Sequence, residues 1–147
     1  MVEEIDEKSL YILKVLSKNS RLSSREIAGL LRMHPTTVIK KIKEMERGKI
    51  ITKYTINVDY EKLGYGIMAL VFVQFEFGNY DIQKLVEKSE IISRYEITGE
   101  YDIMCVVIAK DRSKLKDVIH SISMTPGVKR TYTVMVLKTT KEPMFVF

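Results

Sequence analysis

Residues 23–48 of the chain read SSREIAGLLRMHPTTVIKKIKEMERG. Ser23 and Glu26 have the spacing of a capping box, in which the hydroxyl accepts from a first-turn amide and the carboxylate accepts from the Ser23 N–H. Pro35 suits the first position of a second helix, because its fixed φ matches the helix and the N–H it lacks has no helical partner. We expect that helix to end at Gly48, in the left-handed conformation. The stretch therefore predicts two helices joined by a tight turn, a helix-turn-helix.

A further helix precedes this pair. Asp6 is placed to cap its first turn, and Asn19-Ser20 ends it. The apolar residues of all three helices recur at the spacing that gives one buried stripe per helix. They are Ile5, Ile12, Leu13 and Leu16 in the first helix, Ile27, Ala28 and Leu31 in the second, and Val38, Ile42 and Met45 in the third. We therefore expect a domain of three helices around one core.

The face of the third helix opposite its apolar stripe carries hydroxyls and basic groups. It consists of Thr36, Lys40, Lys43 and Arg47, flanked by Thr37 and Lys41. Between Arg21 and Lys53, nine basic residues stand against three glutamates, a local charge of +6 in a chain of net charge +5. Such an excess is typical of a phosphate-binding surface. An ordinary solvated helix is the alternative, but it would mix Glu and Lys across this face, so the arrangement favours DNA binding.

These residues predict how the domain contacts double-stranded DNA. We expect Thr36, Thr37 and Lys40 to reach base edges in the major groove. Lys43 and Arg47 are expected at base edges or phosphates. The residues expected to hold the DNA backbone are Lys41, Arg21, Ser23 and Ser24, the serines at a helix N-terminus that favours anions. His34 is expected to cap the third helix or to contact DNA itself.

After Gly48 the pattern changes to strands. Residues 50–57 predict a short strand, a wing or linker, that completes a DNA-binding domain over 1–58. Residues 59–147 follow the β-α-β-β-α-β order of a ferredoxin-like sandwich. The expected elements are strands at 67–77, 91–98, 101–109 and 128–138, a short helix after Asn79 with Ile82, Leu85 and Val86, and a helix with Leu115, Val118, Ile119 and Ile122. Thr98-Gly99-Glu100 is expected to form the central hairpin. The predicted fold class is α+β, a winged helix-turn-helix followed by this sandwich.

The first strand of the sandwich is apolar on both faces. One side carries Ile67, Ala69 and Val71, and the other carries Met68, Leu70 and Phe72. Two helices cover only one face of a four-stranded sheet, and monomers rarely expose large apolar patches. We therefore expect a homodimer formed sheet to sheet, which also suits a twofold DNA site.

The sequence contains no signal of an enzyme. Cys105 lies within a strand and is interpreted as a small buried hydrophobe rather than a nucleophile. His34 and His120 fall in different domains without ligand spacing, and no phosphate-binding loop is present. The single cysteine, the acidic N-terminus and a longest uncharged stretch of 13 residues favour a soluble cytoplasmic protein without a membrane partner. We expect no enzymatic activity, no cofactor and no metal.

A series of short motifs runs along nearly the whole chain. They are Ile5-Asp6, Ile12-Leu13-x-x-Leu16, Asn19-x-Arg21-Leu22-Ser23, Glu26-Ile27-Ala28, Thr37-Val38, Lys41-Ile42-Lys43, Gly48-Lys49-Ile50-Ile51, Thr98-Gly99-Glu100-Tyr101-Asp102, Pro126-Gly127-Val128 and Thr131-Tyr132-Thr133-Val134. In this order and at these spacings, they resemble the Lrp/AsnC (leucine-responsive, feast/famine) family of transcriptional regulators.

The resemblance implies a sequence-specific regulator that forms dimers, often assembled into octamers, and that responds to an amino acid effector. In such proteins the effector pocket lies between sandwich domains, around a Gly-x-Tyr-Asp hairpin and the last strand. By position, the implied effector-binding residues are Gly99, Tyr101, Asp102, Tyr132, Thr133 and Val134. The chain departs from the family at Arg32, where Gly is usual, and at His34, where Ser is usual. Arg32 is therefore expected in a left-handed conformation or at a phosphate.

Two other functions share part of this pattern. An architectural protein that compacts DNA without sequence preference would carry the same basic face. A regulatory subunit that senses an amino acid and acts on an enzyme would have the sandwich but no affinity for DNA.

Overall fold

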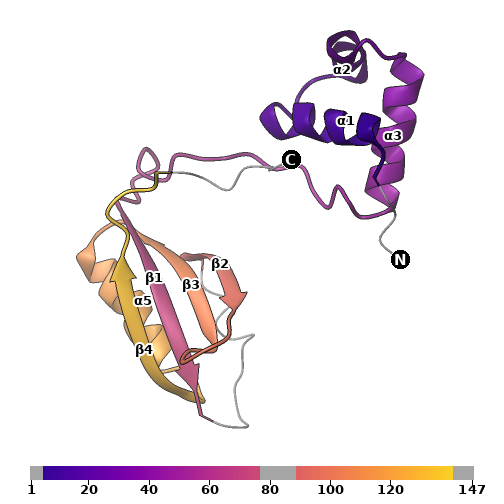
Figure 1. Cartoon of the computed structure of the whole chain (residues 1–147). Coiled ribbons are helices and arrows are strands. Elements are labelled where there is room, and N and C mark those ends of the chain that lie inside the picture. The colour runs from indigo at the N-terminus through magenta and orange to yellow at the C-terminus, as the bar shows by residue number, and fades with distance from the viewer. Residues whose placement is uncertain (1–4, 77–88, 141–147) are drawn as a thin grey trace. The chain divides into compact units, whose positions relative to one another are not determined.

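The computed structural model describes residues 5–76 and 89–140. The chain folds as two compact units, one ending at Asn57 and the other spanning Val58–Thr140. The first unit consists of helices and the second is built on a β-sheet (Figure 1). This is the α+β combination that the sequence predicts.

Three helices form the first unit, α1 (Glu7–Lys18), α2 (Ser24–Leu31) and α3 (Pro35–Arg47). The starts of α1 and α2 confirm the predicted side-chain caps. The Asp6 carboxylate accepts from the Ser9 amide at 3.1 Å, and Ser23 and Glu26 form both bonds of the capping box. Pro35 occupies the beginning of α3. Local side-chain chemistry therefore determines where each helix begins.

The three apolar stripes meet in one core. Ile12, Ile27 and Val38, one from each helix, are completely buried. Leu13, Leu16, Ala28 and Met45 complete the buried cluster, and Ile42 packs against it from α3. The predicted three-helix core is confirmed. Because α3 buries Val38 and Met45, its opposite face must point to solvent.

Two of these helices end with a charged residue in the left-handed region. Arg32 has φ +51° and ψ +46°, as expected, and the Met33 amide donates back to the Ala28 carbonyl at 2.9 Å. At the end of α3 the left-handed residue is Lys49, with φ +55°, and the expectation for Gly48 was wrong. Gly48 keeps φ −73°, because the last turn of α3 continues through it before the Schellman closure.

The expected strand at 50–57 is also wrong, since no part of this segment is a strand in the structure. A strand needs a neighbour to receive its ladder bonds, and within the described residues none lies beside this segment. Ile51 instead packs against the helical core. Tyr54 donates its hydroxyl to the Glu46 carboxylate at 2.8 Å, and burial together with this carboxylate raises the pKa of Tyr54 to about 12.

The second unit is a four-stranded antiparallel sheet with the order β2-β3-β1-β4. Its strands are β1 (Ile67–Phe75), β2 (Ile91–Glu96), β3 (Ile103–Ala109) and β4 (Val128–Met135), and the helix α5 (Arg112–Ser123) precedes β4. This order is that of the predicted ferredoxin-like sandwich. The helix expected after Asn79 lies outside the described residues.

One face of the sheet packs on α5 (Figure 1). Val71 and Val73 of β1 and Ile122 of α5 are fully buried in this core. Cys105 of β3 is buried there too, and desolvation raises the pKa of its thiol to about 11. The thiol therefore stays protonated near neutral pH, which agrees with the prediction of a small buried hydrophobe.

The left-handed Arg32 leads to a stability prediction. A Cβ in this conformation costs on the order of 1–2 kcal/mol, part of which glycine loses again through its greater freedom in the unfolded chain. We expect Arg32→Gly to raise the free energy of unfolding by about 0.5–1 kcal/mol. Lys43→Gly, inside α3, should lower it by about 1 kcal/mol. Denaturant titrations followed by circular dichroism measure both; destabilisation by Arg32→Gly would contradict the assigned strain.

Candidate DNA interface and effector site

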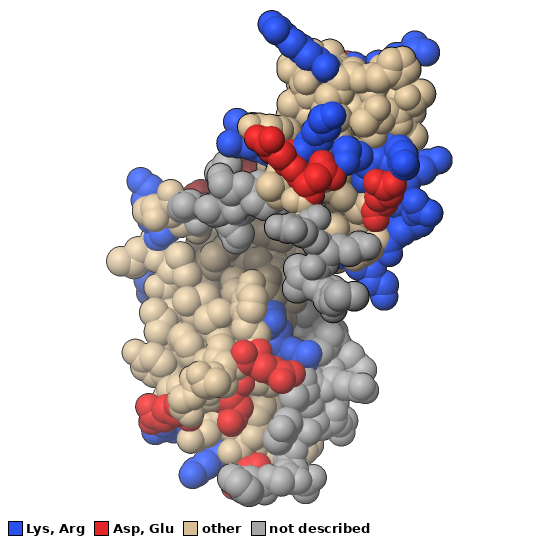
Figure 2. Space-filling model, turned by 45° about the vertical axis from the view of Figure 1, so that its right-hand side comes forward, with Lys and Arg blue, Asp and Glu red and all other residues tan. Residues whose placement is uncertain are grey.

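The face of α3 predicted to meet DNA, a row of hydroxyl and basic residues, is exposed. Thr36, Lys40, Lys43 and Arg47 all face solvent, whereas Val38 and Met45 on the opposite side are 0% and 2% exposed. Figure 2 shows Lys and Arg side chains spread over the helical unit at the top of the view, and a broad uncharged area on the sandwich. The hydroxyl and basic groups of α3 are therefore free to meet a ligand from solution.

The cations of this row are held only weakly. Lys40 lies 3.8 Å from the Glu44 carboxylate, with side-chain exposures of 76% and 45%. Such a solvated pair contributes about 0–1 kcal/mol and is easily exchanged for another anion. The Arg47 Nε donates to the Lys43 carbonyl at 3.4 Å, a long bond of the same surface. Phosphate groups can therefore replace these partners at little cost.

Lys41 is placed differently from the other basic residues of α3. Its ammonium donates to the Asp6 carboxylate at 2.6 Å, and its side chain is only 17% exposed. Ser9 lies 3.4 Å from the same ammonium. The hydrogen bond from Lys41 to the Asp6 carboxylate lowers the pKa of Asp6 to about 2. Lys41 thus ties α3 to the start of α1, and its ammonium is paired with a surface carboxylate instead of standing free with the row.

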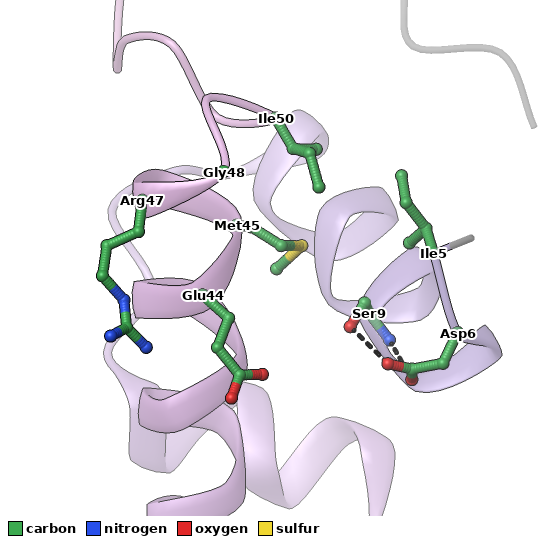
Figure 3. Close-up of a pocket in the computed structure, with 8 residues that line it drawn as sticks. All are labelled: Ile5, Asp6, Ser9, Glu44, Met45, Arg47, Gly48 and Ile50. Atoms are coloured by element: carbon green, nitrogen blue, oxygen red, sulfur yellow. Dashed lines mark hydrogen bonds between the residues drawn. The ribbon is translucent and has the colours of Figure 1, made fainter. Parts of the chain in front are cut away.

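Figure 3 shows the surroundings of Asp6, the residue at the start of α1 to which Lys41 binds. Two hydrogen bonds join Asp6 and Ser9, through the backbone amide at 3.1 Å and the hydroxyl at 3.0 Å. Met45 of α3 projects toward α1 beside them. The hollow they line has a volume of about 640 Å³, and Glu44 and Arg47 stand on its α3 side. On the α1 side of the hollow, the polar groups of Asp6 and Ser9 are already bonded to each other.

The start of α2 presents the predicted serines together with a carboxylate. The Glu26 carboxylate accepts from the Ser23 amide at 2.7 Å, and hydrogen bonds from the Ser23 hydroxyl and amide hold the pKa of Glu26 below its ordinary value. Ser24 is half-buried, whereas Arg21 and Arg25 are exposed. A negative charge at this N-terminus opposes a phosphate there, and the two arginines on either side favour one.

The start of α3 lacks a side-chain cap. His34 occupies the cap position without a hydrogen bond from its ring to the backbone. Its Nδ1 instead lies 2.8 Å from the Thr36 hydroxyl, and Thr37 is half-buried beside them. His34 is therefore the cap residue of α3 by position, as expected, but its ring makes no capping bond and lies against a residue of the exposed row.

The predicted effector residues lie partly at one end of the sheet. Tyr101 and Tyr132 stack with their ring centroids 6.2 Å apart, and Phe72 lies 5.7 Å from the Tyr101 ring. Arg130 stands 5.2 Å above Tyr101 and pairs with the Glu100 carboxylate, which raises the pKa of Arg130. Sequence reasoning missed Phe72, Glu100 and Arg130. The alternation of β4 places Arg130 on the same face as Tyr132, and this signal could have revealed it.

Asp102 has a structural role in the hairpin. Its Oδ2 accepts from the Phe75 amide at 2.8 Å, and its own amide donates to the Val73 carbonyl at 3.0 Å. The side chain thereby extends the pairing of β1 beyond the end of β3. Gly99 has φ +118° at the turn itself, a conformation that favours glycine. Asp102 is nevertheless exposed, so the carboxylate is accessible from solution.

The three predicted residues of β4 do not share a face. Tyr132 and Val134 lie opposite Phe72 and Leu70, on the face away from α5. Thr133 lies opposite the buried Val71, on the side covered by α5. A ligand on the outer face therefore meets Tyr132 and Val134, whereas the Thr133 side chain is behind the sheet.

The described parts of the chain contain neither a metal-binding cluster nor a membrane-spanning helix. Over residues 5–76 and 89–140, no group of three or more His, Cys, Asp or Glu side chains is arranged to hold a metal ion. Nor does any helix of these ranges combine the length and apolar character needed to cross a lipid bilayer.

Comparison with protein families divides the chain in the same way as the structure. Residues 5–52 match the winged helix-turn-helix DNA-binding model, and residues 70–145 match the Lrp/AsnC ligand binding domain. Among curated proteins, the HTH-type transcriptional regulator FL11 of Pyrococcus horikoshii is 33% identical over 143 residues, which cover 96% of this chain and 93% of that protein.

Solved structures share the fold over nearly its full length. AsnC of E. coli superimposes with a TM-score of 0.85 at 25% identity, covering 97% of this chain and 98% of that one. The transcriptional regulator NMB0573 of Neisseria meningitidis, solved as a complex with L-Met, gives a TM-score of 0.89 at 22% identity and covers 95% and 94% of the two chains. The second likeness shows the fold alone.

The Asp6–Lys41 pair predicts a specific acid sensitivity. The pKa of Asp6 is lowered to about 2 in the folded protein. The ionised carboxylate therefore stabilises the fold fully at pH values above its unfolded pKa, near 4, and this stabilisation is lost as the pH falls toward 2. With half of the Asp6 side chain exposed, screening reduces this to about 1 kcal/mol. We expect Asp6→Asn to lower stability by that amount at pH 7 and to flatten its dependence between pH 4 and pH 2.

Acid unfolding followed by circular dichroism measures this effect. Asp111→Asn is the matched control, because Asp111 caps α5 by accepting from the Lys114 amide at 2.8 Å but has no ion pair with a described residue. An identical pH dependence of the wild type and Asp6→Asn would show that the pair contributes nothing.

Proposed function

The chain belongs to the Lrp/AsnC family of DNA-binding transcriptional regulators, and we propose that it reads its operator with the exposed row of α3 while an amino acid at the sandwich modulates binding. The observation that carries the DNA part is the orientation of α3. Its apolar stripe is buried while Thr36, Lys40 and Lys43 face outward. A helix presented in this way fits the major groove, where hydroxyls and ammonium groups meet base edges and phosphates.

The roles of the DNA-facing residues follow from their positions. Thr36, Thr37 and Lys40 lie in the first half of α3, the part that a recognition helix inserts most deeply. Lys43 and Arg47 follow along the same face and contact bases or phosphates. Arg21, Ser23 and Ser24, at the start of α2, hold the DNA backbone. Lys41 acts indirectly, because its bond to Asp6 fixes the position of α3 on α1.

The outer face of the sheet supports a homodimer as the working unit. Leu70 and Phe72 of β1 and Val106 of β3 lie on this face and are only half-buried, while Tyr132 and Val134 are exposed at 55% and 38%. Within the described residues nothing covers these side chains. A second copy of the same face would cover them and place two recognition helices on one twofold operator. Assembly of dimers into an octamer is the next step of the same proposal.

The sandwich domain is the expected site of the effector. Its match to the Lrp/AsnC ligand binding domain and the L-Met complex of the Neisseria meningitidis regulator support an amino acid as the ligand. The proposed contacts are Gly99, Tyr101, Asp102, Tyr132 and Val134, and Thr133 belongs to the proposed site without a direct side-chain contact. A carboxylate such as Asp102 accepts from an α-ammonium group, and Thr133 supports the site from behind the sheet. The chain has no catalytic role in this proposal, and it acts in the cytoplasm, associated with DNA.

Operator binding is tested with Lys40→Ala. Fluorescence anisotropy with duplex DNA from upstream of the protein's own gene, against a scrambled duplex, measures affinity at two salt concentrations. We expect the wild type to prefer the native duplex, and Lys40→Ala to bind it about 1–3 kcal/mol more weakly with a smaller salt slope. Lys116→Ala, on the exposed surface of α5, should bind like the wild type. Equal affinity of Lys40→Ala and the wild type would remove the residue from the interface.

The same titration separates the alternatives when each of the twenty amino acids is added in turn. A shift in affinity with one of them identifies the effector. Salt-sensitive binding without sequence preference would favour the architectural protein. Absence of binding to any duplex would favour a regulatory subunit that senses amino acids.

Dimer formation is tested with Leu70→Lys. This change places a charge in the centre of the outer face without touching the core on the α5 side, so we expect a folded monomer in sedimentation at micromolar concentration and weaker operator binding. Met124→Lys, at the exposed end of α5, should sediment like the wild type. A wild-type monomer would contradict the homodimer, and a Leu70→Lys dimer would place the interface elsewhere.

A further inference from the structure

The start of α3 contains an interaction that bears on which base the helix selects. His34 precedes the helix, and its Nδ1 lies 2.8 Å from the Thr36 Oγ1. Both side chains are exposed. At this distance one proton is shared between the two atoms, supplied either by the hydroxyl or by the ring.

The charge state of the ring decides which group supplies that proton. In the neutral imidazole one ring nitrogen accepts and the other donates. The first turn of a helix carries a positive potential, which favours Nδ1 as the accepting nitrogen, so the Thr36 hydroxyl donates to it. In the imidazolium both nitrogens carry protons, and Nδ1 then donates to Thr36. The Thr36 proton is thereby released to point away from His34.

We propose that His34 sets the base preference of the recognition helix by switching the Thr36 hydroxyl between acceptor and donor. This rests on the proposed position of Thr36 in the major groove. With a neutral His34, the outward side of Thr36 only accepts, which suits the amino groups of adenine and cytosine. With a charged His34, Thr36 donates outward, which suits the O6 of guanine or the O4 of thymine in place of those amino groups.

Charged groups from each neighbouring element face this pair. A hollow of about 450 Å³ beside His34 is lined by Glu7 and Lys8 of α1 and by Arg32 at the end of α2. Glu7 accepts from the Tyr11 hydroxyl at 3.2 Å. Glu7, Lys8 and Arg32 are thus the charged residues that line the hollow beside His34 in the described part of the chain.

The composition of the chain makes the switch easy to isolate. His34 and His120 are its two histidines, and histidine is the side chain whose ordinary titration falls between pH 5 and 8. His120 lies on α5, in the other unit. A change in base preference that persists in His120→Gln and is lost in a His34 variant therefore comes from His34. Its loss together with the Thr36 hydroxyl shows that the change passes through Thr36.

The test is selection of the full-length protein's preferred sites from a random duplex pool, at about pH 5.5 and about pH 8 and at constant ionic strength. For the wild type and for His120→Gln, we expect one base position to shift from A or C toward G or T at the lower pH. A single hydrogen bond predicts a shift of about fivefold in relative enrichment. His34→Asn, which does not titrate, and Thr36→Val, which lacks the hydroxyl, should both show no shift at that position.

The outcomes distinguish the switch from simpler effects. An equal preference at both pH values in the wild type overturns the proposal, and this comparison needs no variant to fold. A shift that persists in Thr36→Val also overturns it, and a uniform gain in affinity at low pH without a base shift means that charged His34 binds phosphate only. No enrichment at either pH would overturn operator recognition itself, and the coupling with it.

Discussion

The rotation of α3 about its own axis is the constraint on which the DNA-binding surface depends. Val38 is completely buried against the two other helices, and at 100° per residue this fixes where every other side chain of α3 points. A rotation by one position would bury Ile39 or Thr37 in place of Val38 and bring a lysine toward the core. The apolar stripe therefore makes the basic row accessible, and the Asp6–Lys41 bond holds the helix at that angle.

One face of the sheet in the sandwich forms its hydrophobic core, and the other is the face that we propose for the homodimer. Ala69, Val71 and Val73 alternate with Leu70 and Phe72 along β1, so a single strand supplies both surfaces. The first set is buried in the core with α5, and the second lies on the outer face that we propose as the homodimer interface. The aromatic cluster of Tyr101, Tyr132 and Phe72 lies at one end of that second face. The proposed dimer interface and the proposed effector site therefore share one surface, and this gives the proposal a direct route by which effector binding can influence association.

Sequence reasoning succeeded where a structure is determined by residues close together in the chain. The caps at Asp6 and Ser23 depend on partners three residues away, and the alternation of β1 needs no partner to be recognised. The clamp between Asp6 and Lys41 spans 35 positions, and neither residue signals the other. The segment 50–57 has the composition of a strand but no neighbouring strand among the described residues, so composition alone was misleading. The different faces of Thr133 and Tyr132 follow from strand alternation, which a match by family position does not take into account.

The helix caps differ between α3 and the other helices that the structure describes. Of the four helices described, α1, α2 and α5 each begin with a side chain that accepts from a first-turn amide, and α3 does not. Such a cap contributes about 1 kcal/mol, so its absence is a cost to the fold. The missing cap falls on the helix that we propose to enter the major groove, where phosphate oxygens can approach an uncapped turn. The His34 ring lies against the Thr36 hydroxyl instead, so in the proposed switch the chain gives up local stability for control over a group at the DNA surface.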